Sequence, residues 1–351
     1  MVSYQLHTVS EVRSWLDRGY VEVILDNTIA YSRAYSMVHS PYVKDDDVLV
    51  ISATDGDKVV GYTAIFPEHL ARPDMWIATG TTLWVDPDYA DDFVGYNLVQ
   101  RLWQSYPQCA VIGSDVSKPA ATIDKLLGAT ITKCARKAYV LNRTIQIRSL
   151  RNLGSFLLEP FRKCRQKKAI RSVLASISSD IHVMARNTID AKAYEFIQSH
   201  SADDTFLRSR ETLNWIMQYP FGVENPVSKR QMHRGIFLEQ ASVHRNHLLY
   251  IYHSADLVGV VMLVQRGTEA HVKMLYADEA YRQQVFAVII EATLQMGAKQ
   301  LYSLNSKLND YIESAHISLK AYNREILFTY PKTMNLEQPL VLQGIEGDMF
   351  A

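Results

Sequence analysis

Apolar and polar positions along the first 142 residues predict a definite order of helices and strands. Apolar residues recur at helical spacing over 10–37, with Ser10 as a cap for the first helix. The stretch 48–67 reads as two strands joined by the turn DGDK, a β-hairpin. A strand at 75–85, a helix at 93–106, a buried strand at 109–115, a helix at 120–129 and a strand at 132–142 follow. This order is typical of an α/β (α+β) layer built on one sheet.

The pattern after residue 178 predicts a second series of elements in a similar order. Strands are expected at 178–188, within 241–267, in the first part of 269–297 and at 299–306. Helices are expected at 190–200, at 207–220, in the second part of 269–297 and at 310–322. VVGYTAIFP corresponds to LVGVVMLVQ, and LWVDPDYADDFVGYNLV corresponds to KMLYADEAYRQQVFAVI. We infer an internal duplication, with one domain at 1–142 and a second, more degenerate copy at 180–351.

The segment 143–179 between the two predicted domains has a different composition. It holds nine Lys and Arg residues against a single acidic residue, Glu159, with leucine and phenylalanine between the cations. This pattern predicts a basic helical connector. One interpretation is a solvated linker packed between domains. The other is a surface for anionic partners or lipid headgroups.

Composition narrows the classes of protein that the chain can belong to. Its 351 residues suit two domains, and 37 basic side chains balance 37 acidic ones, so no overall field favours nucleic acid. The three cysteines have no metal-site spacing, and no metal is expected. No apolar run approaches the ~20 residues of a membrane span, and the N-terminus lacks a secretory pattern. We expect a cytoplasmic protein and leave its oligomeric state open.

Several motifs resemble those of the GNAT family of N-acetyltransferases. They are Val60-Gly61-Tyr62 in the hairpin, Leu83-Trp84-Val85-Asp86-Pro87-Asp88-Tyr89 before a helix, Gly95, and Leu126-Leu127-Gly128-Ala129. The resemblance covers 1–142 well and 180–330 more weakly, and it implies two tandem domains, each a mixed, mostly antiparallel sheet flanked by helices. It also implies acetyl-coenzyme A, or another acyl-coenzyme A, as the donor. Backbone N–H groups at the turn and the helix dipole would hold its pyrophosphate.

The resemblance places cofactor binding on the end of the third strand and the start of the helix that follows it. The residues expected to bind the cofactor are Leu83, Trp84, Val85, Asp92, Phe93, Val94, Gly95, Tyr96 and Asn97. The family's Arg or Gln is replaced by Ala90, and Asp91 and Phe93 replace glycines. The backbone donors at 90–97 remain, because none of these residues is proline.

Candidate catalytic residues follow from the needs of acyl transfer to an amine, a base for the ammonium and an acid for the leaving thiolate. Glu68 after the hairpin and Asp115 at a strand end are candidate bases, and Tyr139 is a candidate acid. The family's tyrosine position corresponds to Asp124 in the first copy. Arg208 and Trp215 are expected to line an acceptor pocket. Each of these residues also has an ordinary structural interpretation, as a solvated loop carboxylate or as core packing.

The sequence therefore predicts an acyl-coenzyme A-dependent acyltransferase. The expected activity is that of an N-acetyltransferase, with a small-molecule or peptide amine as acceptor. Two alternatives stay open at this point. The chain could be a non-catalytic GNAT-fold binding or scaffold protein, because both copies lack the glycines and the tyrosine. It could also transfer amino acids from a charged tRNA, which the basic connector would suit.

Overall fold

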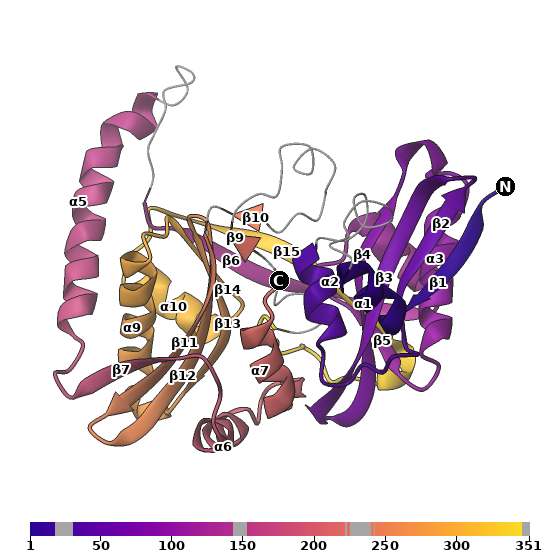
Figure 1. Cartoon of the computed structure of the whole chain (residues 1–351). Coiled ribbons are helices and arrows are strands. Elements are labelled where there is room, and N and C mark those ends of the chain that lie inside the picture. Colours follow the sequence, from indigo (N-terminus) through magenta and orange to yellow (C-terminus); the bar gives the residue numbers. More distant parts are fainter. Residues whose placement is uncertain (18–30, 143–152, 222, 225–239, 242, 346–351) are drawn as a thin grey trace. The chain divides into compact units, whose positions relative to one another are not determined.

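The computed structural model describes residues 1–17, 31–142, 153–221, 223–224, 240–241 and 243–345, which form two compact units (Figure 1). Unit 1 comprises Met1–Cys134, Asp204–Ser242 and Ile326–Ala351. Unit 2 comprises Ala135–Asp203 and Val243–Glu325. The units therefore do not follow the predicted boundaries at 142 and 180. Segments distant in sequence complete unit 1 through strand pairing and packing, a type of contact that local patterns do not encode.

The sheet of unit 1 has the strand order β1-β2-β3-β4-β5-β15. Its strands are β1 (Ser3–Thr8), β2 (Val48–Asp55), β3 (Lys58–Arg72), β4 (Asp74–Val85), β5 (Ala110–Gly113) and the end of β15 (Lys320–Pro331). Neighbouring strands are antiparallel except β4 and β5, which are parallel. The short strand β8 (Leu207–Arg208) pairs antiparallel with the end of β3. Strands β9 (Val223–Glu224) and β10 (Gln240–Ala241) form a separate parallel pair.

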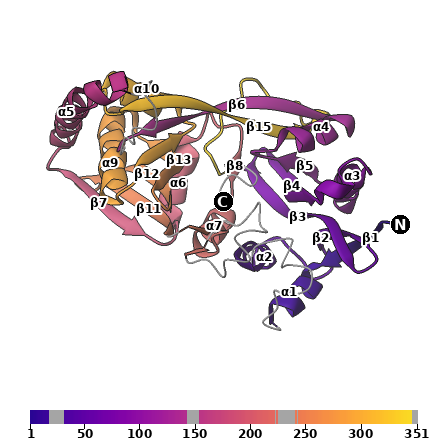
Figure 2. The ribbon, with the colours of Figure 1, turned by 90° about the horizontal axis from the view of Figure 1, so that it is seen from above.

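Helices cover both faces of this sheet (Figure 2). Helix α3 (Val94–Ser105) packs Val94, Leu98 and Leu102 against Ile65 and the apolar residues of β2 to β4. Helix α4 (Lys118–Leu126) follows on the same side, where Ile123 lies near α3. Helices α1 (Val9–Asp17), α2 (Tyr31–Val38) and α7 (Arg210–Gln218) cover the other face.

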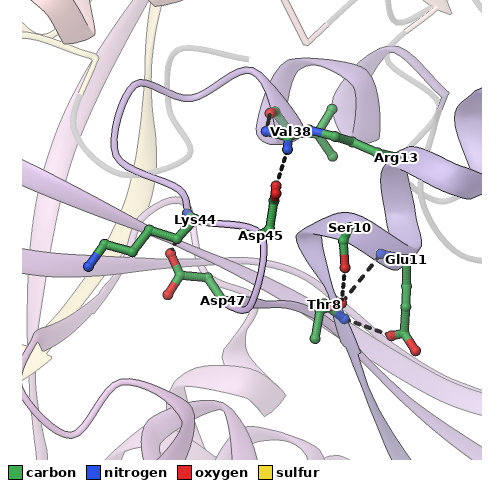
Figure 3. Close-up of polar contacts among 8 residues, drawn as sticks. All are labelled: Thr8, Ser10, Glu11, Arg13, Val38, Lys44, Asp45 and Asp47. Carbon is green, nitrogen blue, oxygen red and sulfur yellow. Dashed lines mark hydrogen bonds and ion pairs between the residues drawn. The ribbon is translucent and has the colours of Figure 1, made fainter.

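The first helix begins at Val9, one residue before its predicted cap, Ser10. Thr8 and Glu11 form a reciprocal capping pair, with the Thr8 N–H donating to Glu11 Oε2 at 2.8 Å and the Glu11 N–H donating to Thr8 Oγ1 at 3.3 Å (Figure 3). Ser10 lies inside the helix. Arg13 connects α1 to two segments. It pairs with Asp45 in the loop before β2, and it donates to the carbonyl of Val38 at the end of α2 at 2.9 Å.

Unit 2 repeats the strand order of unit 1, as β7-β11-β12-β13-β14 followed by the end of β6 (Ala129–Val140). The strands are β7 (Ile181–Arg186), β11 (His244–His253), β12 (Asp256–Arg266), β13 (Glu269–Ala277) and β14 (Gln300–Ser303). Only β13 and β14 are parallel. The helices are α5 (Leu153–Ala175), α6 (Ala191–His200), α9 (Arg282–Gln295) and α10 (Ser306–Ser314). Apolar residues of α9 form the centre of this unit's core.

The last strand of each sequence repeat is exchanged. The end of β6, from the first repeat, belongs to the sheet of unit 2, and the end of β15, from the second repeat, belongs to the sheet of unit 1. β6 follows α4 in the chain but pairs Val140 with Gln300 of β14. β15 follows α10 but pairs Thr329 with Gly113 of β5. The repeated order of elements therefore supports the inferred duplication, while the final strand of each repeat is exchanged.

Three predicted elements need correction. The helix predicted at 10–37 is α1 and α2, and residues 18–30 lie outside the described residues. The helix predicted at 207–220 begins only at Arg210, because Leu207 and Arg208 pair with β3. The helix predicted at 310–322 ends at Ser314, and β15 begins at Lys320.

Candidate functional site

The parallel strands β4 and β5 separate part-way along β4. Ile77–Gly80 pair with Ala110–Gly113, but β4 continues to Val85 with no partner residue in β5. The divergence coincides with a bulge in the pairing with β3, where Tyr62 lies opposite Trp84 and Ala64 opposite Thr81. Thr82 in this bulge has φ +49°. Bulges bend a strand and redirect its side chains, so this one turns the end of β4 away from β5.

A cavity of about 160 Å³ lies at this divergence, within unit 1. β4 contributes Gly80 to Leu83, β5 and its following loop contribute Val111 to Ser117, and α3 contributes Trp103. Gly113 has no room for a side chain, because a Cβ atom there would lie 2.7 Å from Thr329 Oγ1 and 2.8 Å from Val116 Cγ2. The cavity is thus bounded by tightly packed strands, and Ser117 and Ala120 line it at the start of α4.

Asp124 lies in the wall of this cavity with only 9% of its surface exposed. The Thr329 hydroxyl donates to Asp124 Oδ2 at 2.9 Å. Burial raises the pKa of the Asp124 carboxyl, and interactions with Thr329 and Trp103 lower it by less. The net effect of the site is a pKa above the usual range of an aspartic acid. Asp124 stands at the position that resembles the family's tyrosine, which was the one signal in the sequence that pointed to it.

Leu83, Trp84 and Val85, the first three residues predicted to bind the cofactor, lie in three different environments at the end of β4. Leu83 lines the cavity, Val85 packs against the core of α3, and Trp84 stacks on Tyr62 with ring centroids 5.6 Å apart. Asp86 then caps the short helix that follows and pairs with Lys58 Nζ at 2.8 Å. Of the three, Leu83 is the one in position to contact a ligand in the cavity.

The start of α3 carries the remaining predicted cofactor-binding residues. Phe93 is left-handed, with φ +56°, and 72% exposed, and it gives the helix no side-chain cap. The first N–H groups of α3 are therefore available for an anion. Asp91 and Asp92 are both exposed in the same turn, and two carboxylates there oppose the binding of a pyrophosphate.

Gly95 has a packing role in the structure. It is the second residue of α3, it is buried, and a Cβ atom there would lie 3.3 Å from Ile123 and 3.4 Å from Val85. The absent side chain lets α3 approach α4 and the end of β4. The side chains of Tyr96 and Asn97 are half-buried in the same first turn, where Asn97 Nδ2 donates to the Phe93 carbonyl at 3.1 Å.

Glu68 is not in a loop, because β3 continues through it to Arg72. Its carboxylate is 1% exposed and pairs with Arg208, whose Nε lies 3.1 Å from Oε1. Trp215 is also buried, and its Nε1 donates to the Ser36 carbonyl at 2.8 Å. These three predicted residues lie together on the sheet face opposite α3. They form part of the packed interior there and do not line the cavity.

Asp115 and Tyr139 belong to different units. Asp115 is exposed at the cavity rim, directly after β5, with φ +51°. Tyr139 belongs to unit 2, where it is fully buried and its hydroxyl donates to Glu313 Oε1 at 3.1 Å. Burial and the nearby Glu313 carboxylate raise the pKa of Tyr139. Asp115 is therefore the predicted catalytic residue that the structure brings to the cavity.

Two further findings concern the described parts of the chain as a whole. No group of three or more His, Cys, Asp and Glu side chains there is placed to hold a metal ion. None of the helices in these ranges combines the length and the apolar character needed to cross a membrane.

No family model and no curated protein matches the sequence. Among solved structures, a GCN5-related N-acetyltransferase from Anabaena variabilis has a TM-score of 0.52 at 11% identity, over 94% of this chain and 72% of its own. N-myristoyltransferase from Saccharomyces cerevisiae with bound myristoyl-CoA has a TM-score of 0.51 at 8% identity, over 98% and 85%. A tandem GNAT protein of clavulanic acid biosynthesis has a TM-score of 0.50 at 12% identity, over 94% and 98%. The chain therefore has the GNAT fold in tandem form.

Proposed function

We propose that this protein transfers an acyl group from an acyl-coenzyme A to an amine, and that unit 1 carries the reaction. The cavity at the divergence of β4 and β5 is the observation that carries this proposal. It combines the edge of β4 that β5 does not pair with a buried carboxyl, Asp124, whose pKa burial raises. Similar folds that act on acyl-coenzyme A, such as the yeast protein with bound myristoyl-CoA, support the choice of donor.

The cavity suits the arm of a thioester donor, whereas the start of α3, which does not line the cavity, both favours and opposes the donor's phosphates. The edge of β4 beyond Gly80 offers peptide groups that β5 does not pair, and these suit the amide-rich arm of coenzyme A. The N–H groups at the start of α3 suit a phosphate, while Asp91 and Asp92 weaken it. We therefore expect binding that relies on the arm more than on the pyrophosphate. Bound there, the donor supplies a thioester carbonyl that an amine can attack.

Two carboxyl groups divide the proton transfers of this reaction. Asp115, exposed at the rim, accepts a proton from the attacking ammonium group, directly or through water. Asp124, whose pKa is raised by burial in the wall, acts as the acid that gives a proton to the sulfur as the carbon–sulfur bond breaks. Asp115 is exposed to solvent and suits the role of base, whereas Asp124 is buried and suits the role of acid.

Calorimetric titration with acetyl-coenzyme A and with a long-chain acyl-coenzyme A tests the site. Ala120→Phe places a ring in the cavity, because Ala120 lines it from α4. Thr122→Phe is the matched control, since Thr122 is exposed on the same helix. We expect the first variant to lose binding at least tenfold and the second to bind as the natural chain does. Equal binding by both variants, or none by the natural chain, contradicts the proposal.

The rival to this proposal is a binding protein without catalysis. The acidic turn at Asp91 and Asp92 is the observation that favours it. If the cavity binds the donor but no amine from a screen of amino acids, polyamines and peptides is acylated, the binding role is the better account.

A further inference from the structure

Helix α5 of unit 2 carries a dense group of cations on its outer side. Residues 160–175 include six basic side chains and no acidic one: Arg162, Lys163, Arg165, Lys167, Lys168 and Arg171. In Figure 1 the helix runs along the edge of unit 2 beside α9. The inner side is fixed by Val173 and by Gln166, whose Nε2 donates to the carbonyls of Leu141 at 2.7 Å and Ile317 at 2.8 Å.

Helical geometry places most of these cations on one face. With 3.6 residues per turn, Arg165, Lys167, Lys168 and Arg171 lie on the half of the helix away from Gln166, and all four are exposed. Phe161 lies on the same half and is 76% exposed. We call these five residues the cationic face of α5.

The charges of the cationic face are not neutralised within the described part of the chain. No acidic side chain described there pairs with any of its four cations. The chain as a whole has no net charge, so this face is a local concentration of positive charge on a balanced surface. Such a face attracts a partner whose negative charges lie close together.

We propose that the cationic face of α5 binds an anionic lipid surface. The four cations lie on one side of α5 within about two turns of the helix, so all can reach the headgroups of a flat bilayer together. The exposed ring of Phe161 favours a lipid surface over other polyanions as the partner. A phenyl ring among cations gains free energy when it leaves water at the boundary between headgroups and acyl chains. Lys and Arg stems extend along that boundary while their charged ends stay in water.

Co-sedimentation of the full chain with lipid vesicles tests this proposal. One set of vesicles is pure phosphatidylcholine, and the other contains a third of phosphatidylserine. We expect partition onto the anionic vesicles alone, weakening as salt is raised. The triple variant Arg165→Gln, Lys168→Gln and Arg171→Gln should lower the partition coefficient by roughly 10- to 100-fold, because each cation near such a surface contributes about a fivefold factor.

Two controls separate the cationic face from general charge and from folding. Lys192→Gln, Lys307→Gln and Lys320→Gln together remove three exposed cations elsewhere on unit 2 and should leave the partition within threefold of the natural chain. Phe161→Ala should weaken partition while leaving its salt dependence unchanged. Equal loss in both triple variants overturns the proposal, as does tighter binding to single-stranded RNA than to anionic vesicles. Neither outcome depends on acyl transfer.

Discussion

The burial of Asp124 has a consequence for stability that can be measured without a substrate. A carboxyl whose pKa is raised on folding stabilises the fold below the pKa of the unfolded chain, about 3.9, and this contribution is lost as pH rises through the folded pKa. Asp124→Asn keeps an acceptor for Thr329 and cannot ionise. At a pH above the folded pKa of Asp124, we expect this variant to have a larger free energy of unfolding than the natural chain, by about 1.4 kcal/mol for each unit by which folding raises that pKa. The two should melt alike near pH 3.

The same variant separates catalysis from binding. If Asp124 protonates the leaving sulfur, Asp124→Asn should lower kcat by 10²- to 10⁴-fold, roughly the effect of a lost general acid, and leave donor affinity within a few-fold. In the natural chain kcat should fall as pH passes the raised pKa of Asp124. Asp115→Asn should also lower kcat, because it removes the proposed base. Steady-state kinetics across pH measure both, and an unchanged kcat in Asp124→Asn removes it from the mechanism.

Glu68 and Arg208 form a buried ion pair whose contribution to stability can be tested. Removing one member of a buried ion pair leaves an uncompensated charge, so Glu68→Gln should cost about 3–5 kcal/mol of unfolding free energy. The double variant Glu68→Leu and Arg208→Met should recover most of this loss. Chemical denaturation measures the stability, and activity per folded molecule decides the role. A double variant that folds but is inactive returns Glu68 to the candidates for catalysis.

The bulge in β4 is the element that opens the cavity, and Thr82 is its strained residue. A β-branched residue at φ +49° is costly, and glycine adopts this conformation freely. We expect Thr82→Gly to be neutral or to stabilise the chain by up to about 1 kcal/mol. Thr81→Gly, the neighbouring control, should destabilise it, because Arg33 donates to the Thr81 hydroxyl. Urea unfolding compares them, and an equal loss in both variants contradicts a strained bulge.

Elements with a strong local pattern were predictable from sequence. The DGDK turn joins β2 to β3 as expected, and α3 follows β4 at the predicted place. Non-local pairings were not predictable. The pattern indicated a strand end near Pro67, while β3 continues through Glu68 because Arg208 neutralises it from β8. The sequence pointed to the turn between β4 and α3 as a binding site. It did not predict the contact of Asp124 with Thr329 of β15, because the two residues are distant in the chain.

The exchange of final strands makes each unit depend on both copies. Unit 1 takes Thr329 from β15 and Trp215 from α7, and a fragment of residues 1–142 lacks both. It also leaves Glu68 buried without Arg208. We therefore expect the fragment 1–142 to lack a cooperative thermal transition, and co-expression with 143–351 to restore one. Circular dichroism and hydrogen exchange measure this. A fragment that melts cooperatively alone would show that the first copy is a self-sufficient domain and that the exchanged strands are accessory.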